Sequence, residues 1–368
     1  MLKQIQTRLK SLTFAAAAPM LAAGMATGGM LASAAPAAAQ ANNLESEFDR
    51  ALGTRSREPQ TFAAQYESSF ERRIAQLADG DRGRIGVYAV DLTTGKEVSV
   101  LADQRFPMAS TSKVAIAAVF LAGVDQGRWS LSSEFPLLTR IKSKRFSSQR
   151  ANTVSSRYVS GQKLIDLMIS KSCNSCTDAL LHIVGGPGAV NQWMQRTAGI
   201  SNFELSRDIA TLVRDDGEYD PAAWIDPRDS ASPRAMGLLL AGIYNGRWLS
   251  PRSRSVILNA MQATTTGRDR MKAALPLRAN LAHKTGTLTR TASDIGFFRL
   301  DDGRTIAAAI YVTGQSANLT DEARNKRASR SKRDRRIADI TRALYDGYAQ
   351  QSGRNNGRQW TNGVWTGG

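Results

Sequence analysis

The sequence predicts a mixed α/β fold of the α+β type. One antiparallel sheet of about five strands is flanked by N- and C-terminal helices and carries an inserted all-helical lobe. Two observations predict this fold: segments with alternating apolar residues lie near both ends of the chain, and segments with apolar residues at helical spacing fill its middle. Strands from distant segments must therefore pair in one sheet, and a pocket is expected at the seam between the two lobes.

The N-terminal part of the sheet lobe is expected to begin with a helix over 61–77, where apolar residues recur every three or four positions. An Asp-Gly-Asp sequence at 79–81 ends this helix. Residues 84–91 then alternate as a strand, and residues 97–101 return as its hairpin partner after a Thr-Gly turn.

The middle of the chain contains mainly helical patterns. One helix begins near Ser110, and others are predicted over 164–169, 177–184, 190–198 and 233–244. The segment 201–232 between the last two is rich in Asp and Arg. A loop of that length inside a compact domain is usually functional or disordered.

Strand patterns return near the C-terminus, over 282–287, 294–300 and 305–313, and predict consecutive antiparallel strands. An amphipathic helix over 337–348 closes the domain. Residues 350–368 are rich in Gly, Asn and Gln, and we expect this tail to be disordered.

The N-terminus has the pattern of a secretory signal, with basic residues, an Ala-, Met- and Leu-rich stretch and then small residues that allow cleavage after Ala39 or Ala41. An uncleaved anchor helix is the alternative, and the many Ala and Gly residues make it a poor anchor. Cleavage would place the protein in a periplasm or outside the cell. The expected organisation is a signal peptide (1–39), a leader (40–61), a main domain (62–349) and the tail (350–368). The main domain is expected to have a sheet lobe at 62–107 and 247–349 and a helical lobe at 108–246.

The chain is strongly basic, with a formal charge of +17, and many of its cations lie between Arg324 and Arg336. A basic run can bind nucleic acid, but an exported protein meets little of it. Anionic envelope polymers or lipid head groups are therefore the candidate partners, and a solvated surface is the simpler interpretation. No apolar run after the signal is long enough to span a membrane.

The chain has two cysteines, Cys173 and Cys176, which can close a small disulfide in an oxidising compartment. A zinc site would need two more ligands, and the two histidines, His182 and His283, are far apart in sequence. We favour the disulfide over free thiols, and the sequence implies no metal and no organic cofactor.

A candidate nucleophile and base lie together in Ser110-Thr111-Ser112-Lys113. Residues three apart at the start of a helix share a face, so the amine of Lys113 can take a proton from Ser110 if that amine is neutral. Burial or a nearby cation such as Lys284 would lower the pKa of Lys113 accordingly. Taken alone, the pattern also fits an ordinary capped helix start.

Two further segments add a proton relay and an anion clamp. In Ser172-Cys173-Asn174 the hydroxyl can pass a proton to a leaving nitrogen, and the amide can position substrate and base. In the predicted strand that begins at Lys284, this lysine and Thr285 can hold a carboxylate, and Gly286 lets a ligand lie against the backbone. The backbone N–H of Thr287, with that of Ser110, would form an oxyanion hole. Alone, these segments also fit a helix cap and an edge strand.

In this order and spacing the three segments match the S-x-x-K, S-D-N and K-T-G set of the penicillin-recognising serine enzymes. The chain resembles a class A β-lactamase-type serine hydrolase over roughly residues 62–349. Besides the three motifs, the short segments at 105–108, 185–187 and 226–229 carry this resemblance. The resemblance implies that Ser110 attacks the lactam carbonyl, Lys113 assists, Ser172 protonates the leaving nitrogen, and Lys284 with Thr285 binds the substrate carboxylate.

The chain departs from the family pattern at three places. Cys173 replaces an acid, and Arg290 is the only guanidinium close in sequence that could support the carboxylate clamp. The third departure is the loop Glu that activates water to release the acyl group, which is missing, so the base could be Asp208, Asp216, Glu218 or absent. The candidate catalytic residues are thus Ser110, Lys113, Ser172 and Asp216, and the candidate substrate-binding residues are Asn174, Lys284, Thr285, Gly286, Thr287 and Arg290.

Three functions are therefore weighed. The first is a hydrolase that opens the β-lactam amide through an acyl-enzyme at Ser110. The second is a penicillin-binding or D,D-peptidase-like protein that releases its acyl group slowly because the loop Glu is missing. The third is a non-catalytic envelope-binding module, against which the intact Ser110, Lys113 and Lys284 argue.

Overall fold

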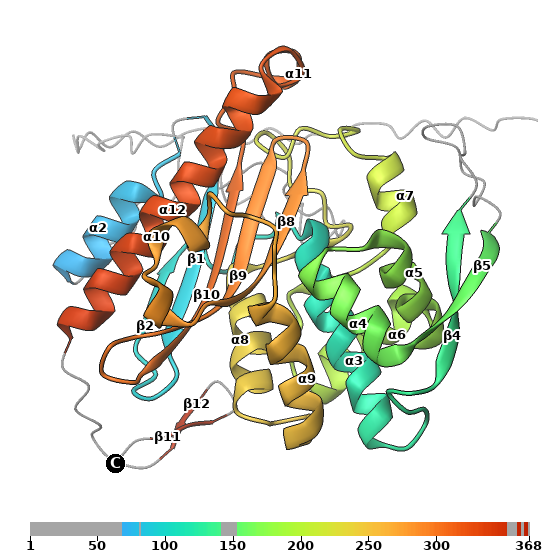
Figure 1. Ribbon diagram of the computed structural model, residues 1–368. Coiled ribbons are helices and arrows are strands. Elements are labelled where there is room, and N and C mark those ends of the chain that lie inside the picture. The colour runs from blue at the N-terminus through green and yellow to red at the C-terminus, as the bar shows by residue number, and fades with distance from the viewer. Residues whose placement is uncertain (1–67, 81, 141–152, 352–358, 362–363, 367–368) are drawn as a thin grey trace, which may run out of the picture. The chain divides into compact units, whose positions relative to one another are not determined.

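The computed structural model of the protein describes residues 68–80, 82–140, 153–351, 359–361 and 364–366 (Figure 1). The expected signal peptide and leader lie outside these residues, as does the first part of the helix expected over 61–77. None of the helices within the described ranges is long and apolar enough to cross a membrane.

A five-stranded antiparallel sheet, in the order β2-β1-β10-β9-β8, confirms the fold class expected from the sequence. The N-terminal strand β1 pairs directly with the C-terminal strand β10, with Val87 opposite Ile310. Strand β8 is left at one edge, where it contacts the inserted lobe. The five strands are β1 (Ile85–Asp91), β2 (Glu97–Val100), β8 (Ala282–Leu288), β9 (Thr291–Arg299) and β10 (Thr305–Thr313).

Helices cover both faces of this sheet, because its strands carry apolar residues on both sides. Every residue of β1 is buried. The helices α2 (Ser69–Leu77) and α12 (Lys326–Gln350) contact each other and pack on one face, where Ile74 and Leu344 join one apolar cluster (Figure 1). The helix α8 (Pro233–Tyr244) packs on the other face against β1 and β10.

The inserted lobe is built around α3 (Lys113–Asp125), whose residues 113–123 are all buried. A helix that is buried all round shows no amphipathic stripe. The helical segment begins near Ser110, as expected, with a 3₁₀ turn over Ala109–Ser112 that continues directly into α3. The helices around it include α9, which the sequence pattern did not reveal. They are α4 (Gly161–Ser170), α5 (Asn174–Ile183), α6 (Gly186–Gln192) with a π-helical turn (Trp193–Thr197), and α9 (Pro251–Gln262).

The expectation of an all-helical lobe is wrong in one respect, because a β-hairpin of β4 (Glu134–Arg140) and β5 (Thr153–Ser160) belongs to it. Pro136 lies in β4 next to a break in the strand register. A proline within a run argues against a strand and is tolerated at edges and bulges, which explains why the pattern was missed.

A small sheet joins the start of the lobe to the long loop over 201–232, in the order β3-β7-β6. Its strands are β3 (Phe106–Pro107), β6 (Phe203–Glu204) and β7 (Ser230–Ala231). Short helices complete the fold: α7 (Ile209–Arg214), α10 (Met271–Ala274) and α11 (Leu319–Arg324).

The expected disordered tail differs from the structure at one place. Strands β11 (Gln359–Thr361) and β12 (Val364–Thr366) pair as a hairpin, with Trp360 opposite Trp365 in the register. The sequence between the two strands is Asn-Gly, the dipeptide that most favours a two-residue hairpin turn.

Candidate active site

Ser110 lies in a 3₁₀ turn, Ala109–Ser112, immediately before α3. Ala109 has a left-handed φ of 49°, a conformation that costs a non-glycine residue about 1–3 kcal/mol and clusters at functional sites. The neighbouring hydroxyls are occupied, since Thr111 Oγ1 donates to Met108 O at 2.7 Å and Ser112 Oγ to Ala109 O at 2.9 Å. Ser110 is partly exposed, and its side chain has no hydrogen-bond partner among the described residues.

The amine of Lys113 is fully buried. Lys113 Nζ donates to Asn174 Oδ1 at 2.7 Å and to Ser172 O at 2.9 Å. Burial lowers the pKa of Lys113 to about 7, and the charge of Asp178 partly opposes this shift. A large fraction of the amine is therefore neutral near neutral pH, which is the form that can accept a proton.

Ser172 holds its hydroxyl between two lysine amines. Lys113 Nζ lies 3.2 Å and Lys284 Nζ lies 3.0 Å from Ser172 Oγ. Ser172 itself adopts a left-handed φ of 57°, a strained conformation that the surrounding contacts must maintain. A hydroxyl that accepts one hydrogen bond and donates another can pass a proton between neighbours.

Lys284 projects from β8 and is fully buried. Its Nζ also donates to Thr285 O at 2.8 Å. Burial, followed by the nearby charge of Lys113, holds the pKa of Lys284 well below its usual range. Two buried amines that share one hydroxyl titrate as a pair, so protonation of one disfavours protonation of the other.

The strand β8 packs against the turn that carries Ser110 (Ala109–Ser112, the nucleophile turn), and Gly286 lies at this contact. A Cβ at position 286 would lie 2.7 Å from Met108 O and 3.1 Å from Ala109 Cβ. A Cβ would also lie 2.4 Å from Ser293 Oγ, so on this side the glycine leaves room for packing within the protein, and its expected role in letting a ligand lie against the strand stays a prediction. Gly286 sets the spacing between Ser110 and β8.

The rest of β8 is held by residues outside the strand. Thr285 Oγ1 lies 2.6 Å from Thr266 Oγ1. Arg270, which is buried and was not singled out from the sequence, donates to Thr287 Oγ1 at 2.7 Å and to Gly286 O at 2.8 Å. No spacing rule connects Arg270 to this strand, so only the fold reveals the contact.

Arg290 does not lie where a carboxylate clamp would need it. Its guanidinium is buried, with Nη2 donating to Ser316 O at 2.9 Å and Nε 3.1 Å from Asp220 Oδ1. Arg290 adopts a left-handed φ of 53° in the turn between β8 and β9. It thus ties the long loop to that turn, and Arg270 is the guanidinium that reaches the strand of Lys284.

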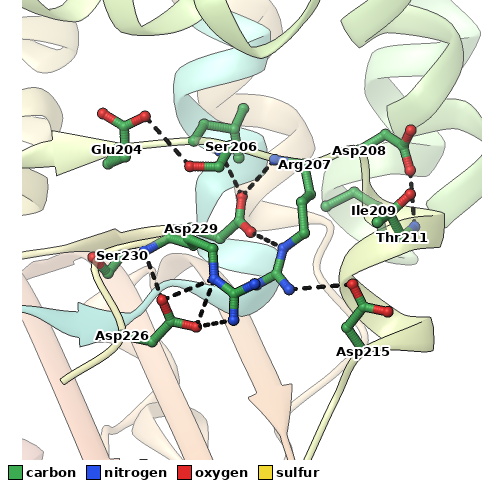
Figure 2. A network of polar contacts seen from close by, with 12 residues as sticks. Glu204, Ser206, Arg207, Asp208, Ile209, Thr211, Asp215, Asp226, Asp229 and Ser230 are labelled. Carbon is green, nitrogen blue, oxygen red and sulfur yellow. Dashed lines mark hydrogen bonds and ion pairs between the residues drawn. The ribbon is translucent and has the colours of Figure 1, made fainter. Parts of the chain in front are cut away.

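The long loop is held in place by a network of ion pairs (Figure 2). Asp229 accepts from the backbone N–H groups of Ser206 at 2.8 Å and Arg207 at 3.0 Å, and from Arg207 Nε at 2.6 Å. The guanidinium of Arg207 also reaches Asp215 at 3.4 Å. The loop is therefore an ordered structural element with its own polar interior.

The three candidate carboxylates of this loop are all engaged in other contacts. Asp208 caps α7 by accepting from Thr211 N at 2.8 Å. Asp216 accepts from Thr289 N at 2.9 Å and from Thr289 Oγ1 at 2.9 Å. Glu218 pairs with Arg228 at 3.0 Å. None of these contacts involves Ser110 or Lys113.

Asp178 is an acidic residue that the sequence analysis missed. Its carboxylate is buried on α5 and accepts from Ile209 N at 2.7 Å and Ala210 N at 3.1 Å, at the start of α7. It also raises the pKa of Lys113 against the effect of burial. The available signal was its helical spacing, four residues after Asn174.

Cys173 and Cys176 form a disulfide, as favoured from the sequence. The bond joins the residue between Ser172 and Asn174 to the first turn of α5. The two side chains that contact Lys113 therefore flank a cross-linked residue. Within the described part of the chain no group of three or more His, Cys, Asp or Glu side chains could hold a metal ion.

Comparison with known proteins agrees with this geometry. The model of the beta-lactamase enzyme family matches residues 69–348. A beta-lactamase of Streptomyces albus G is 30% identical over 60% of this chain and 68% of its own length.

Two solved structures also match. A mutant of the class A beta-lactamase of the last common ancestor of Gram-negative bacteria covers 77% of this chain and 100% of its own, with a TM-score of 0.64 and 28% identity. A PBP-A mutant, solved as an acyl-enzyme complex with penicillin G, covers 77% of this chain and 97% of its own, with a TM-score of 0.62 and 25% identity. Since the family model spans most of the chain, the protein belongs to the beta-lactamase enzyme family.

Proposed function

We propose that the protein is a serine hydrolase that opens the β-lactam amide through an acyl-enzyme at Ser110. The observation that carries this proposal is the shared hydroxyl of Ser172, which lies within 3.2 Å of two buried lysine amines, one of them on Lys113, three residues after the partly exposed Ser110. Few structural roles require two buried amines on one hydroxyl, whereas acyl transfer requires a base, a relay and a cation together.

In the proposed reaction, neutral Lys113 takes the proton of Ser110 while Ser110 Oγ bonds to the lactam carbonyl carbon. The C–N bond then breaks, and the nitrogen receives a proton from Ser172 Oγ, which is replenished by the lysine amines. No hydrogen bond joins Ser110 Oγ to Lys113 Nζ before substrate binds, and such catalytic contacts often tighten only with substrate. Asn174 holds the amine of Lys113 in position.

The strand β8 is proposed to bind the substrate along one side. The amine of Lys284, which a bound carboxylate would favour in its protonated form, and the hydroxyl of Thr285 would hold the substrate carboxylate, with Gly286 fixing the distance to Ser110. The backbone N–H groups of Thr287 and Ser110 would stabilise the oxyanion. Arg270 supports this side through Thr287.

A time course with a penicillin tests this function, with intact-protein mass spectrometry and turnover of a chromogenic β-lactam measured in parallel. We expect an adduct on Ser110 that forms and disappears as product accumulates. An adduct that persists would favour the slow acyl-enzyme described next. If no adduct and no turnover are detected, the catalytic proposal is wrong and the non-catalytic envelope module gains support.

A second candidate function is a penicillin-binding or D,D-peptidase-like protein with slow deacylation. The specific observation in its favour is that Asp208, Asp216 and Glu218 all have partners other than the catalytic residues. A general base must reach the water that it activates, so a carboxylate bound elsewhere contributes little to deacylation. Asp216 thus remains a predicted base whose contact with Thr289 argues against it.

Whether Asp216 or Glu218 acts as the deacylating base can be tested directly. We expect Asp216→Asn and Glu218→Gln to change the rate of adduct loss less than threefold, because amides at both positions can keep part of the present contacts. The measurement is the decay of the isolated acyl-enzyme followed by mass spectrometry. A decay slowed by a factor of about 100 or more in either variant would identify that residue as the deacylating base.

The contact between Gly286 and the nucleophile turn gives a further prediction. Gly286→Ala is expected to slow acylation by a factor of about ten or more and to lower the melting temperature. The added Cβ would clash with Met108 O, a backbone atom that can move only if the turn carrying Ser110 is distorted. Gly188→Ala is the matched control, since a Cβ there meets nothing within 4 Å. Equal rates in the two variants would show that this spacing is not needed.

The cellular location is part of the same proposal. The N-terminal pattern supports export by a cleaved signal peptide, which would bring the active site to the periplasm or outside the cell, where β-lactams and peptidoglycan occur. N-terminal sequencing of the protein recovered from the envelope fraction tests the cleavage. A start at residue 40 or 42 is expected, and an intact N-terminus in the cytoplasmic fraction would contradict it.

A further inference from the structure

A hollow that shares no residue with the active site lies where the ends of β1 and β10 meet α12. Its volume is about 430 Å³, and it is open to solvent. Arg82 precedes β1 and Gln315 follows β10, whereas the remaining lining residues belong to α12. We call this hollow the basic groove; it is lined by Arg82, Gln315, Lys332, Arg335, Arg336 and Asp339.

The basic groove carries more positive than negative charge, and Asp321, outside its lining, lies close enough to Lys332 and Arg82 for their charges to lower its pKa. The side chains of Arg82, Lys332 and Arg335 are exposed and make no hydrogen bond or ion pair within the described part of the chain. Arg336 Nη1 donates to Leu77 O at 3.5 Å. The only carboxylate among the lining residues is that of Asp339.

The wall of the groove is fixed by a buried ion pair, which holds together the backbone positions that carry its cations. Arg333 pairs with Glu322 and donates to Gly314 O at 2.8 Å, next to Gln315. This contact anchors the first half of α12 to the end of β10. Holding cations together at this position costs electrostatic free energy, which an anion would recover.

The surface next to the groove extends the same charge. Four more basic side chains near the start of α12 are exposed, and Figure 1 shows α11 and the first turns of α12 reaching beyond the strands. Basic residues that continue away from a pocket fit an extended polyanion better than a small ion. They are Arg324, Lys326, Arg327 and Arg330.

The chemistry of the groove favours a phosphorylated glycan over a lipid surface or a nucleic acid. A helix that binds a membrane surface presents a large apolar face, and residues 324–336 contain no apolar side chain larger than alanine. A site for single-stranded nucleic acid uses aromatic stacking, and no aromatic residue lines the groove. Asp339 and Gln315 can instead accept hydrogen bonds from sugar hydroxyls beside the phosphate-binding cations.

We propose that the basic groove and the start of α12 bind a phosphate-bearing polysaccharide of the cell envelope. Arg82, Lys332 and Arg335 would pair with its phosphate groups, and Asp339 would accept from its sugar hydroxyls. This surface shares no residue with the active site, so binding would hold the enzyme at the envelope while Ser110 remains free to react. The choice of an envelope polymer rests on the proposed export.

The test measures binding of the full-length protein to phosphorylated dextran by fluorescence anisotropy at low ionic strength, with unmodified dextran as the uncharged control. The variant Lys332→Glu/Arg335→Glu is expected to raise the Kd for phosphorylated dextran by a factor of about ten or more and to weaken its salt dependence. Arg252→Glu/Arg342→Glu is the matched control, because it changes the net charge equally at exposed positions outside the groove. Its Kd should change less than threefold.

Several outcomes would overturn the proposal. An equal loss of binding in both double variants would mean that net charge alone attracts the polymer. Tighter binding to phosphatidylglycerol vesicles or duplex DNA than to phosphorylated dextran would assign the groove to another partner.

Hydrolysis of a soluble β-lactam by Lys332→Glu/Arg335→Glu should be unchanged, so failure of the groove proposal and failure of the proposed activity are distinguishable.

Discussion

Replacing Ser110 by alanine is expected to abolish the covalent adduct with a penicillin and to reduce β-lactam turnover by a factor of about 10⁴ or more. No other hydroxyl of the nucleophile turn can substitute, because Thr111 Oγ1 and Ser112 Oγ donate to backbone carbonyls and are buried. Intact-protein mass spectrometry measures the adduct, and a chromogenic β-lactam measures turnover. The melting temperature should stay the same, because the Ser110 hydroxyl has no partner among the described residues.

The neighbouring serine provides the control. Ser112→Ala removes a hydroxyl from the same turn but leaves Ser110 in place. The adduct should therefore form at a rate within about tenfold of that of the unchanged protein. A penicillin adduct that survives in Ser110→Ala would exclude Ser110 as nucleophile. Loss of the adduct in both variants would point to a distorted turn instead.

The rate of acylation is expected to increase as the pH rises through about 7 and to level off above it. Lys113 can accept the proton of Ser110 only when its amine is neutral, and burial lowers its pKa to about 7. Lys113→Ala should reduce kcat/KM by a factor of about 10²–10⁴. It should also remove the acidic limb of the pH profile, that is, the rise of kcat/KM between acidic pH and about pH 7. The measurement is kcat/KM against pH, which reports groups of the free enzyme.

Asp178 supplies the matched test of this assignment. Its charge raises the pKa of Lys113, so Asp178→Asn is expected to lower that pKa further and move the acidic limb to lower pH. The amide can still accept from one of the two backbone N–H groups of α7 that Asp178 now binds. A limb that moves to higher pH, or stays where it is, would assign the titration to another group.

The sheet could be predicted from the sequence because its strands are short apolar segments bounded by turn sequences, such as the Thr-Gly pair between β1 and β2. The helix expected to begin near Ser110 is present, with a first turn of 3₁₀ type over Ala109–Ser112 that leads directly into α3. The hairpin of β4 and β5 was missed because Pro136 lies within it. This error arises where a register break overrides the local pattern.

The active site could be predicted only as far as local motifs extend. The order of the Ser110, Ser172 and Lys284 segments indicated a shared site, and the structure brings Lys113, Ser172 and Lys284 into hydrogen-bond contact. The contacts of Arg270 and Asp178 depend on chain segments that meet only in the folded protein. Arg290 was chosen for its nearness in sequence, whereas the turn directs it to Asp220 and Ser316.

The pairing of β1 with β10 has a consequence for how the chain acquires its structure. Arg84 and Thr313 are hydrogen-bonded although they lie 229 positions apart. A ribosome must therefore release most of the polypeptide before the central pair of strands can form. Contacts so distant slow the folding of a newly made chain.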